Sequence, residues 1–134
     1  MFWKGIAHTA YAVSDMKASL EFYVEKLGFT HAFSLSKPDT GEKWIEYLRV
    51  APGQFVELFY AEGEIGKNSS YRHLCLETAD AYATAKELEA RGVKIDVYPK
   101  QGSDKNIQCW IHDPDGNPVE IMQISPESPQ AKAN

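Results

Sequence analysis

Two histidines and two glutamates occur in this chain at nearly equal spacings, and together they could hold a divalent metal ion. Glu57 follows His8 by 49 positions, and Glu120 follows His73 by 47. Imidazole nitrogens suit Zn, Ni, Co or Fe, and carboxylate oxygens extend the choice to Mn. A bound ion with open positions polarises a carbonyl group, which makes a neighbouring C–H more acidic. The spacing therefore predicts a four-residue metal site built by two copies of one unit.

The elements around these residues also repeat. Each half predicts a strand, a helix that ends at a glycine (Gly28 or Gly92), and three further strands. The expected strands lie near 5–13, 29–37, 43–50 and 55–61 in the first half, and near 71–78, 93–99, 105–112 and 118–124 in the second. The expected helices run from Ser14 or Asp15 to Leu27 and from Asp80 to Arg91.

The predicted fold class is therefore α+β, with two β-α-β-β-β modules that form a curved, partly barrel-like mixed sheet with the helices outside. We expect a single domain over 1–125, followed by a flexible tail at 126–134 that is rich in proline and polar residues. Within the domain, the first module covers 1–61, a polar linker covers 62–70, and the second module covers 71–125.

Composition excludes several functional classes. The formal net charge is −5 and no basic stripe occurs, which argues against a nucleic-acid partner. No apolar run reaches the roughly 18 residues that cross a membrane. The two cysteines, Cys75 and Cys109, lie in apolar segments and suggest buried thiols rather than a disulfide framework. A reducing cytoplasm is the simplest location.

The two glutamates are unusual in their strands. Glu57 is the one charged residue in the segment FVELFY, and Glu120 stands likewise in VEIM. Strand alternation places Phe55, Glu57 and Phe59 on one face, and leaves the other face apolar and suited to a helix. A carboxylate on the first face loses solvation, so we expect it to meet a cation or to be used chemically.

The histidines divide into two groups. Ala10 and Ala12 follow His8 on its face of the strand and leave room for a ligand. His31 and His112 have no counterpart in the opposite half, so we interpret both as peripheral.

These residues carry a family resemblance. The segments HTAYAVSDM, FYVEKLGF, VELFY, HLCLE and DPDGNPVEI resemble the vicinal oxygen chelate superfamily, which includes glyoxalase I, bleomycin-resistance proteins and extradiol dioxygenases. The resemblance covers Ala7 to Ile124. A His, Glu, His, Glu order is similar to bacterial glyoxalase I, with His8, Glu57, His73 and Glu120 as the metal ligands.

The resemblance implies a divalent-metal-dependent lyase or isomerase that moves a proton next to a carbonyl through a metal-bound enediolate. Its substrate would be a small molecule with vicinal oxygens. By analogy, Glu120 is the first choice for the catalytic base and Glu57 the second. The family usually works as a dimer, so a homodimer is expected, with modules that pair within or between chains. An extradiol-type dioxygenase and a binding protein without catalysis are the alternatives.

One departure concerns the thiol carrier. Glutathione-dependent members have an arginine four residues after the first ligand and an asparagine four after the second, and here these positions are Ala12 and Ala61. The resemblance therefore leaves the use of glutathione open. Five apolar residues are expected to form the substrate wall, with core packing as the alternative for each: Phe55, Phe59, Met122, Trp44 and Trp110.

Overall fold

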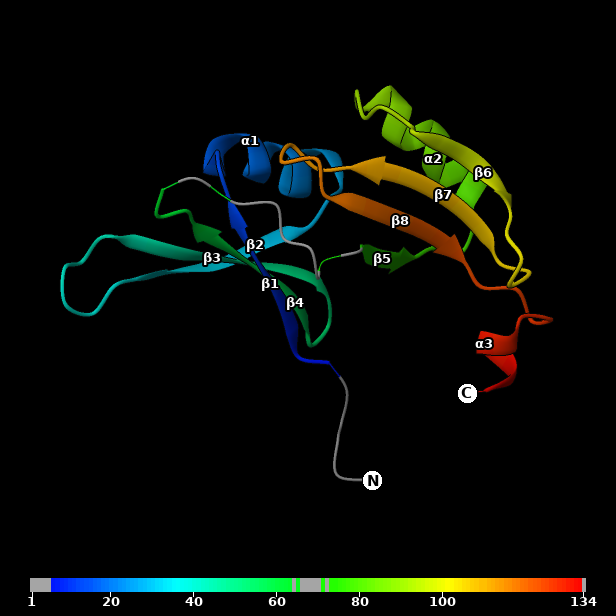
Figure 1. Cartoon of the computed structure of the whole chain (residues 1–134), viewed down its shortest axis with the longest axis horizontal. Helices are drawn as coiled ribbons and strands as arrows, with labels where there is room; N and C mark the ends of the chain where they lie inside the picture. The colour runs from blue at the N-terminus through cyan, green and yellow to red at the C-terminus, as the bar shows by residue number, and fades with distance from the viewer. Residues whose placement is uncertain (1–5, 64, 66–70, 72, 134) are drawn as a thin grey trace. The chain divides into compact units, whose positions relative to one another are not determined.

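The computed structural model describes residues 6–63, 65, 71 and 73–133. The chain divides into two compact units, Met1–Lys67 and Asn68–Asn134, each of which has its own sheet and helix (Figure 1). The expected fold class, α+β with a β-α-β-β-β order in each half, is confirmed. Most of the expected 62–70 linker lies outside the described residues.

The first unit contains a mixed sheet of four strands in the order β1-β4-β3-β2. β1 pairs with β4 in parallel, and the remaining neighbours are antiparallel. Its elements are β1 (His8–Val13), α1 (Met16–Leu20), η1 (Glu21–Lys26), β2 (Thr30–Ser36), β3 (Lys43–Ala51) and β4 (Gln54–Tyr60).

The second unit repeats this topology in the order β5-β8-β7-β6, again with one parallel pair, β5 with β8. Its elements are β5 (Leu74–Glu77), α2 (Ala81–Ala90), β6 (Val97–Gln101), β7 (Ile107–His112), β8 (Pro118–Gln123) and α3 (Pro129–Lys132). Helix α3 lies inside the tail that was expected to be flexible, and that flexibility stays a prediction.

Local sequence accounts for the helix boundaries. Asp15 and Asp80 cap the N-termini of α1 and α2, since each carboxylate accepts a bond from the backbone N–H three residues ahead. Gly28 and Gly92 have φ values of 80° and 81°, a conformation that disfavours a side chain and ends the helix. The glycine stops predicted from sequence are therefore confirmed.

The first helix differs from its prediction in one respect. A single α-helix was expected, but the segment Glu21–Lys26 is a π-helix that continues from α1. The N–H of Leu27 bonds to the carbonyl of Phe22 at 2.9 Å, which is the five-residue step of this geometry. The apolar stripe that predicted the helix does not distinguish the two forms over so short a segment.

Strand alternation sets the two cores. Val56 and Leu58 of β4 are 1% and 0% exposed, and Val119 and Ile121 of β8 are 0% and 3% exposed. In each unit the helix lies across one face of the sheet (Figure 1). The glutamates Glu57 and Glu120 sit between these residues in sequence and therefore point to the opposite face.

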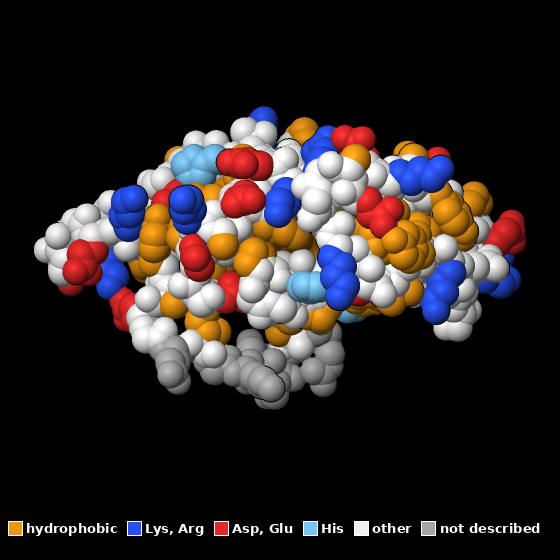
Figure 2. Space-filling view, turned by 90° about the horizontal axis from the view of Figure 1, so that it is seen from above, with side chains coloured by type: hydrophobic (Ala, Val, Ile, Leu, Met, Phe, Trp, Pro, Cys, Tyr) orange, Lys and Arg blue, Asp and Glu red, His pale blue; other side chains and the backbone are white. Residues whose placement is uncertain are grey.

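Acidic, basic and hydrophobic side chains are interspersed over the face of the molecule in Figure 2. Among the helices formed by the described residues, none is both long and apolar enough to cross a membrane.

Leu58→Ala is expected to lower the free energy of unfolding by about 2–5 kcal/mol, because a fully buried side chain leaves a cavity. Leu35→Ala, at a β2 side chain that is 39% exposed, should cost about 1 kcal/mol or less. Urea unfolding of both variants measures the difference. Equal losses would show that the helix face of β4 is not the core of the first unit.

Candidate metal and substrate site

Each unit brings one predicted histidine to one predicted glutamate. In the first unit Nε2 of His8 lies 3.2 Å from a carboxylate oxygen of Glu57. In the second unit Nε2 of His73 lies 3.2 Å from a carboxylate oxygen of Glu120. The glutamate side chains are 6% and 5% exposed, whereas the histidine side chains are 47% and 39% exposed. Each pair therefore combines a buried carboxylate with a more accessible imidazole.

The register of the parallel strands is the same in both units. Ala10 of β1 pairs with Glu57, and Cys75 of β5 pairs with Glu120. In both cases the histidine lies two residues before the partner of the glutamate, so it reaches the carboxylate diagonally from the same face. The spacing from His8 to Glu57 is 49 residues and that from His73 to Glu120 is 47. This difference therefore arises in the segments that connect the paired strands.

An aromatic residue contacts each His–Glu pair from the strand that is antiparallel to the glutamate's strand. Tyr47 of β3 pairs with Glu57, and its ring lies edge-on to His8 with centroids 6.3 Å apart. Trp110 of β7 pairs with Glu120, and its ring lies edge-on to His73 at 5.0 Å. The repeated arrangement is thus a histidine at the start of the first strand or directly before it, a glutamate on its parallel neighbour, and an aromatic ring on the next strand.

The aromatic residues differ in what they give to the carboxylate. The Tyr47 hydroxyl hydrogen-bonds to Glu57, and this bond, assisted by burial and by the negative charge of Glu57, raises the pKa of Tyr47. Tyr47 also stacks on Phe33 with ring centroids 4.3 Å apart. Glu57 is therefore held by a phenol whose ring is itself fixed by packing.

Sequence reasoning missed Tyr47, because an irregularity between Arg49 and Ala51 shifts the register of its hairpin. Tyr47 lies four residues before the turn at 51–54 and Glu57 lies three residues after it, whereas Trp110 and Glu120 each lie three residues from the turn at 113–117. In an antiparallel hairpin, residues equidistant from the turn face each other. Counting outward from the turns would therefore have paired Trp110 with Glu120, but it would have paired Leu48 rather than Tyr47 with Glu57.

Cys75 lies beside Glu120 on the surface of the second unit. Cys75 was expected to be buried. This expectation is wrong, because the residue is exposed on the sheet face that carries Glu120. Its sulfur nevertheless faces Glu120, and partial burial of the thiol together with the Glu120 carboxylate raises the pKa of Cys75 to about 12. Cys109, by contrast, is fully buried, as expected.

Three of the five expected substrate-wall residues lie in the first unit. Phe55 pairs with His8 across the β1–β4 ladder and is partly exposed. Phe59 contacts Trp44, with ring centroids 6.0 Å apart at an edge-to-face angle. Their contact with a substrate stays a prediction.

The other two residues lie in the second unit. Trp110 contacts His73, as described above. Met122 is only 7% exposed, and its sulfur accepts a hydrogen bond from the Asn106 amide at 3.5 Å. Met122 is therefore mainly a packing residue beside Glu120.

The two histidines interpreted as peripheral both have carboxylate partners. His112 Nδ1 lies 2.6 Å from Asp96, and His31 Nε2 lies 2.6 Å from Glu46. Neither histidine joins the His–Glu pairs within its own unit.

The donor atoms in each pair fit a borderline or hard divalent cation, because each offers one imidazole nitrogen and one carboxylate oxygen. Within the described part of the chain, no group of three or more His, Cys, Asp or Glu side chains gathers closely enough to hold a metal ion. Each unit by itself therefore offers two candidate ligands, and the four-residue site stays a proposal.

The sequence model of the Glyoxalase/Bleomycin resistance protein/Dioxygenase superfamily matches residues 5–121. The chain belongs to this superfamily. The expected family is therefore confirmed, and the duplicated His–Glu pairs lie within the matched residues.

Proteins similar to this chain have names that indicate different functions. The chain is 30% identical over 127 residues to a "Probable lactoylglutathione lyase" of Vibrio cholerae, and the match covers 88% of this chain and 89% of the relative. A glyoxalase family protein from Enterococcus faecalis has a similar structure, with a TM-score of 0.78, 26% identity and coverage of 91% and 99%. TnmS3, an antibiotic binding protein from Streptomyces sp. CB03234, gives a TM-score of 0.73, 27% identity and coverage of 93% and 99%.

The raised pKa of the Cys75 thiol predicts slow reaction with a disulfide reagent at pH 8, at least about tenfold slower than a free cysteine, because little thiolate is present. Glu120→Gln should speed the reaction, since it removes the neighbouring negative charge. The colour change with Ellman's reagent follows the rate, and unfolded protein, in which both thiols react, is the control. A fast reaction that is insensitive to Glu120→Gln would contradict the placement of Cys75 against that carboxylate.

Proposed function

We propose that this protein is a divalent-metal-dependent lyase or isomerase of the glyoxalase I type. The observation that carries the proposal is the repeated His–Glu pair, built in the same register in each unit. In the proposed site His8, Glu57, His73 and Glu120 would hold a divalent ion, which would supply polarisation of the carbonyl of a substrate with vicinal oxygens.

Burial makes the charged forms of Glu57 and Glu120 less stable than they would be in water. Both lie within apolar strand segments and are less than a tenth exposed, so solvation does little to stabilise their charge. A bound cation would compensate for that loss, and a buried carboxylate that no cation holds would be a stronger base than one in water.

Glu120 is the better candidate for that base. Glu57 accepts a hydrogen bond from the Tyr47 phenol, which opposes any movement of its carboxylate. Glu120 meets the thiol of Cys75, and a thiol is a weak donor. Glu120 is thus freer to take a proton from the carbon next to the carbonyl and to return it to the adjacent or the same carbon. The first course isomerises the substrate and the second epimerises it.

The thiol partner is proposed to differ from that of the glutathione-dependent relatives. Ala12, on the exposed side of β1, pairs with Phe59, and Ala61 directly follows β4. Neither side chain can donate a hydrogen bond to a peptide carboxylate. An oxygenated substrate without a glutathione carrier therefore fits this pair of positions better. A homodimeric, cytoplasmic protein is part of the same proposal.

A binding function without catalysis is the second candidate, because the antibiotic binding protein from Streptomyces matches the fold at 27% identity. It differs from the first candidate in needing no metal. An extradiol dioxygenase is the third candidate. Such an enzyme would consume oxygen together with a catechol.

Metal analysis tests the site directly. The purified protein is expected to contain about one divalent ion per chain, and both His8→Ala and Glu120→Gln should lose most of it, because each removes one of four ligands. Glu87→Gln, at an exposed side chain of α2, is the matched control and should keep the metal. Metal retained in both site variants would refute the site, and a parent protein that binds ligands without metal would favour the binding function.

Turnover assays then test the substrate class. Methylglyoxal with glutathione or other thiols is compared with α-hydroxyketones and sugars alone, while proton exchange at carbon is followed by NMR in D₂O. We expect exchange or isomerisation without a thiol, and a loss of at least about a hundredfold in Glu120→Gln, because this variant lacks both a proposed metal ligand and the proposed general base. A strict requirement for glutathione would contradict the inference from Ala12 and Ala61. Oxygen uptake with a catechol would favour the dioxygenase instead.

A further inference from the structure

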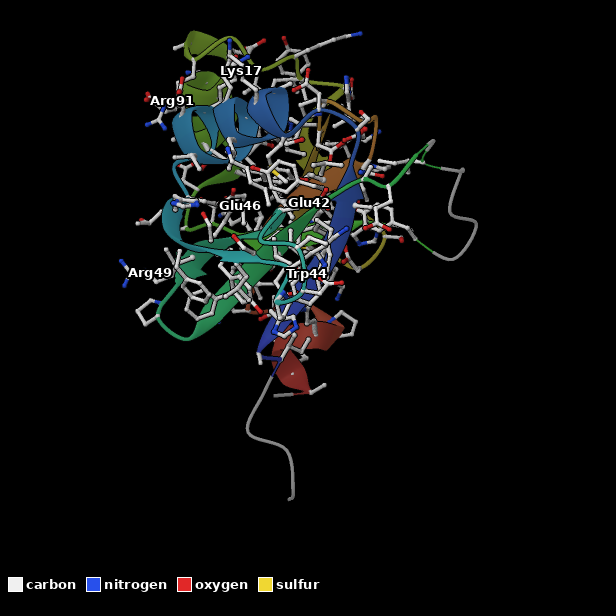
Figure 3. All side chains as sticks on the ribbon, turned by 90° about the vertical axis from the view of Figure 1, so that its left-hand side faces the viewer. Lys17, Glu42, Trp44, Glu46, Arg49 and Arg91 are labelled. Atoms are coloured by element: carbon white, nitrogen blue, oxygen red, sulfur yellow. The ribbon has the colours of Figure 1, made fainter. Side chains whose placement is uncertain are left out.

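The helix face of the first unit carries a second polar cluster, separate from the His8–Glu57 pair. Tyr47 pairs with Glu57 on one face of the sheet, so the preceding residue, Glu46, points to the other face. Figure 3 shows Glu46 on the strand below helix α1, the helix that carries Lys17. Glu46 is 6% exposed.

Three hydrogen bonds hold the Glu46 carboxylate. The Tyr60 hydroxyl donates to it at 2.8 Å, the Ser34 hydroxyl donates to it, and His31 Nε2 lies 2.6 Å away. Burial raises the pKa of Glu46, but the bonds from Ser34, His31 and Tyr60 outweigh burial, and the net pKa is lowered. The cluster therefore keeps a buried negative charge.

The arrangement is not that of an activated nucleophile. In a Ser–His–acid triad the two imidazole nitrogens serve different partners. Here Ser34 lies 3.4 Å from the same Nε2 that contacts Glu46, and its own proton goes to the carboxylate. The hydroxyl is thus not prepared to attack a substrate, and the cluster is suited to binding.

An open groove of about 630 Å³ lies over this cluster. Met16 and Leu20 of α1 and Val24 of η1 form its apolar wall. Part of that wall is the π-helix, a rare element that is found often at functional sites. The full lining is Met16, Lys17, Leu20, Glu21, Val24, Glu25, His31, Ser34, Lys43, Glu46 and Tyr60.

The second unit shows that the fold does not require this cluster. Cys109 takes the position of Glu46, since it precedes the residue that pairs with Glu120, and it is fully buried. Gln123 takes the position of Tyr60, and its side-chain oxygen accepts the N–H of Ala81 at the start of α2. The same topology is therefore built with a small apolar residue where the first unit buries a charge. A charge that folding does not need calls for another explanation.

The hydrogen-bonding capacity left over in the groove defines the ligand. The Ser34 and Tyr60 hydroxyls each donate their hydrogen bond to Glu46, so their oxygens offer only lone pairs to a ligand. Glu46 keeps about one further acceptor position. Besides His31, which contacts Glu46, the groove is lined by three carboxylates and two lysines, so its carboxylates outnumber its ammonium groups. A ligand that supplies donors and positive charge is favoured.

We propose that this groove binds a small organic ammonium ion whose apolar body packs on the helix. The ammonium group lies against Glu46, with the Ser34 and Tyr60 oxygens as further acceptors. The apolar body lies against Met16, Leu20 and Val24, where burial of apolar surface adds to the affinity. This site is on the opposite sheet face from Glu57 and does not depend on the proposed metal chemistry.

Three probes of similar shape and different charge test the proposal on the full chain: 2-phenylethylammonium, 2-phenylethanol and 3-phenylpropionate. Calorimetry measures affinity, and ¹H–¹⁵N NMR locates the site. The ammonium is expected to bind at least about tenfold more tightly than the alcohol, with shifts in α1, η1 and β3. No binding of the ammonium, or equal binding of the alcohol or the carboxylate, would overturn the proposal, as would shifts confined to the Glu57 face.

Two variants separate the charge from the shape of the groove. Glu46→Gln is expected to weaken ammonium binding by about tenfold, because the charge is lost, and thermal unfolding checks that this variant is folded. Leu20→Trp fills the apolar wall, leaves the polar cluster intact, and should abolish binding even if Glu46→Gln does not fold. Unchanged binding in Leu20→Trp, or in folded Glu46→Gln, would refute the site.

Glu57→Gln is the control on the opposite face. It should keep ammonium binding in the groove while it loses metal, if the proposed function is also correct. Loss of groove binding in Glu57→Gln would contradict the proposal, because it would place the probe at the other face.

Discussion

The structure depends on the burial of one carboxylate in the middle of each sheet. Glu57 and Glu120 have apolar residues on both sides in their strands, and both are almost completely removed from solvent. An unpaired charge in such a place is strongly destabilising, so each glutamate needs a partner. The parallel neighbour strand provides one, because its histidine lies two residues from the glutamate's register position.

Duplication supplies this arrangement twice, but the copies are not equivalent. The first unit surrounds Glu57 with a phenol, and the second surrounds Glu120 with an indole and a thiol. Two carboxylates with different neighbours can take different roles, one as a fixed ligand and one as a base. Membership of a superfamily that includes lyases and binding proteins is compatible with such divergence inside one scaffold.

The helix faces diverge in the same way. The second unit fills this region with Cys109 and a regular helix, whereas the first carries a π-helix, a groove and the Glu46 cluster. Because the two units share one topology, the second unit shows which features the topology needs. The features that only the first unit has can serve a separate function.

The sequence by itself determined the order of elements and the four residues of the His–Glu pairs. Alternation in short apolar strands, Asp caps and glycine stops are local signals, and each acts within a few residues of the chain. The repeat then made His8 correspond to His73 and Glu57 to Glu120. Only the tertiary structure showed the π-helix, the Tyr47 bond to Glu57, the exposure of Cys75 and the partnership of His31 with Glu46. These features depend on strand register and on side chains from separate strands that meet across a sheet, and no local pattern encodes which distant residue will face which.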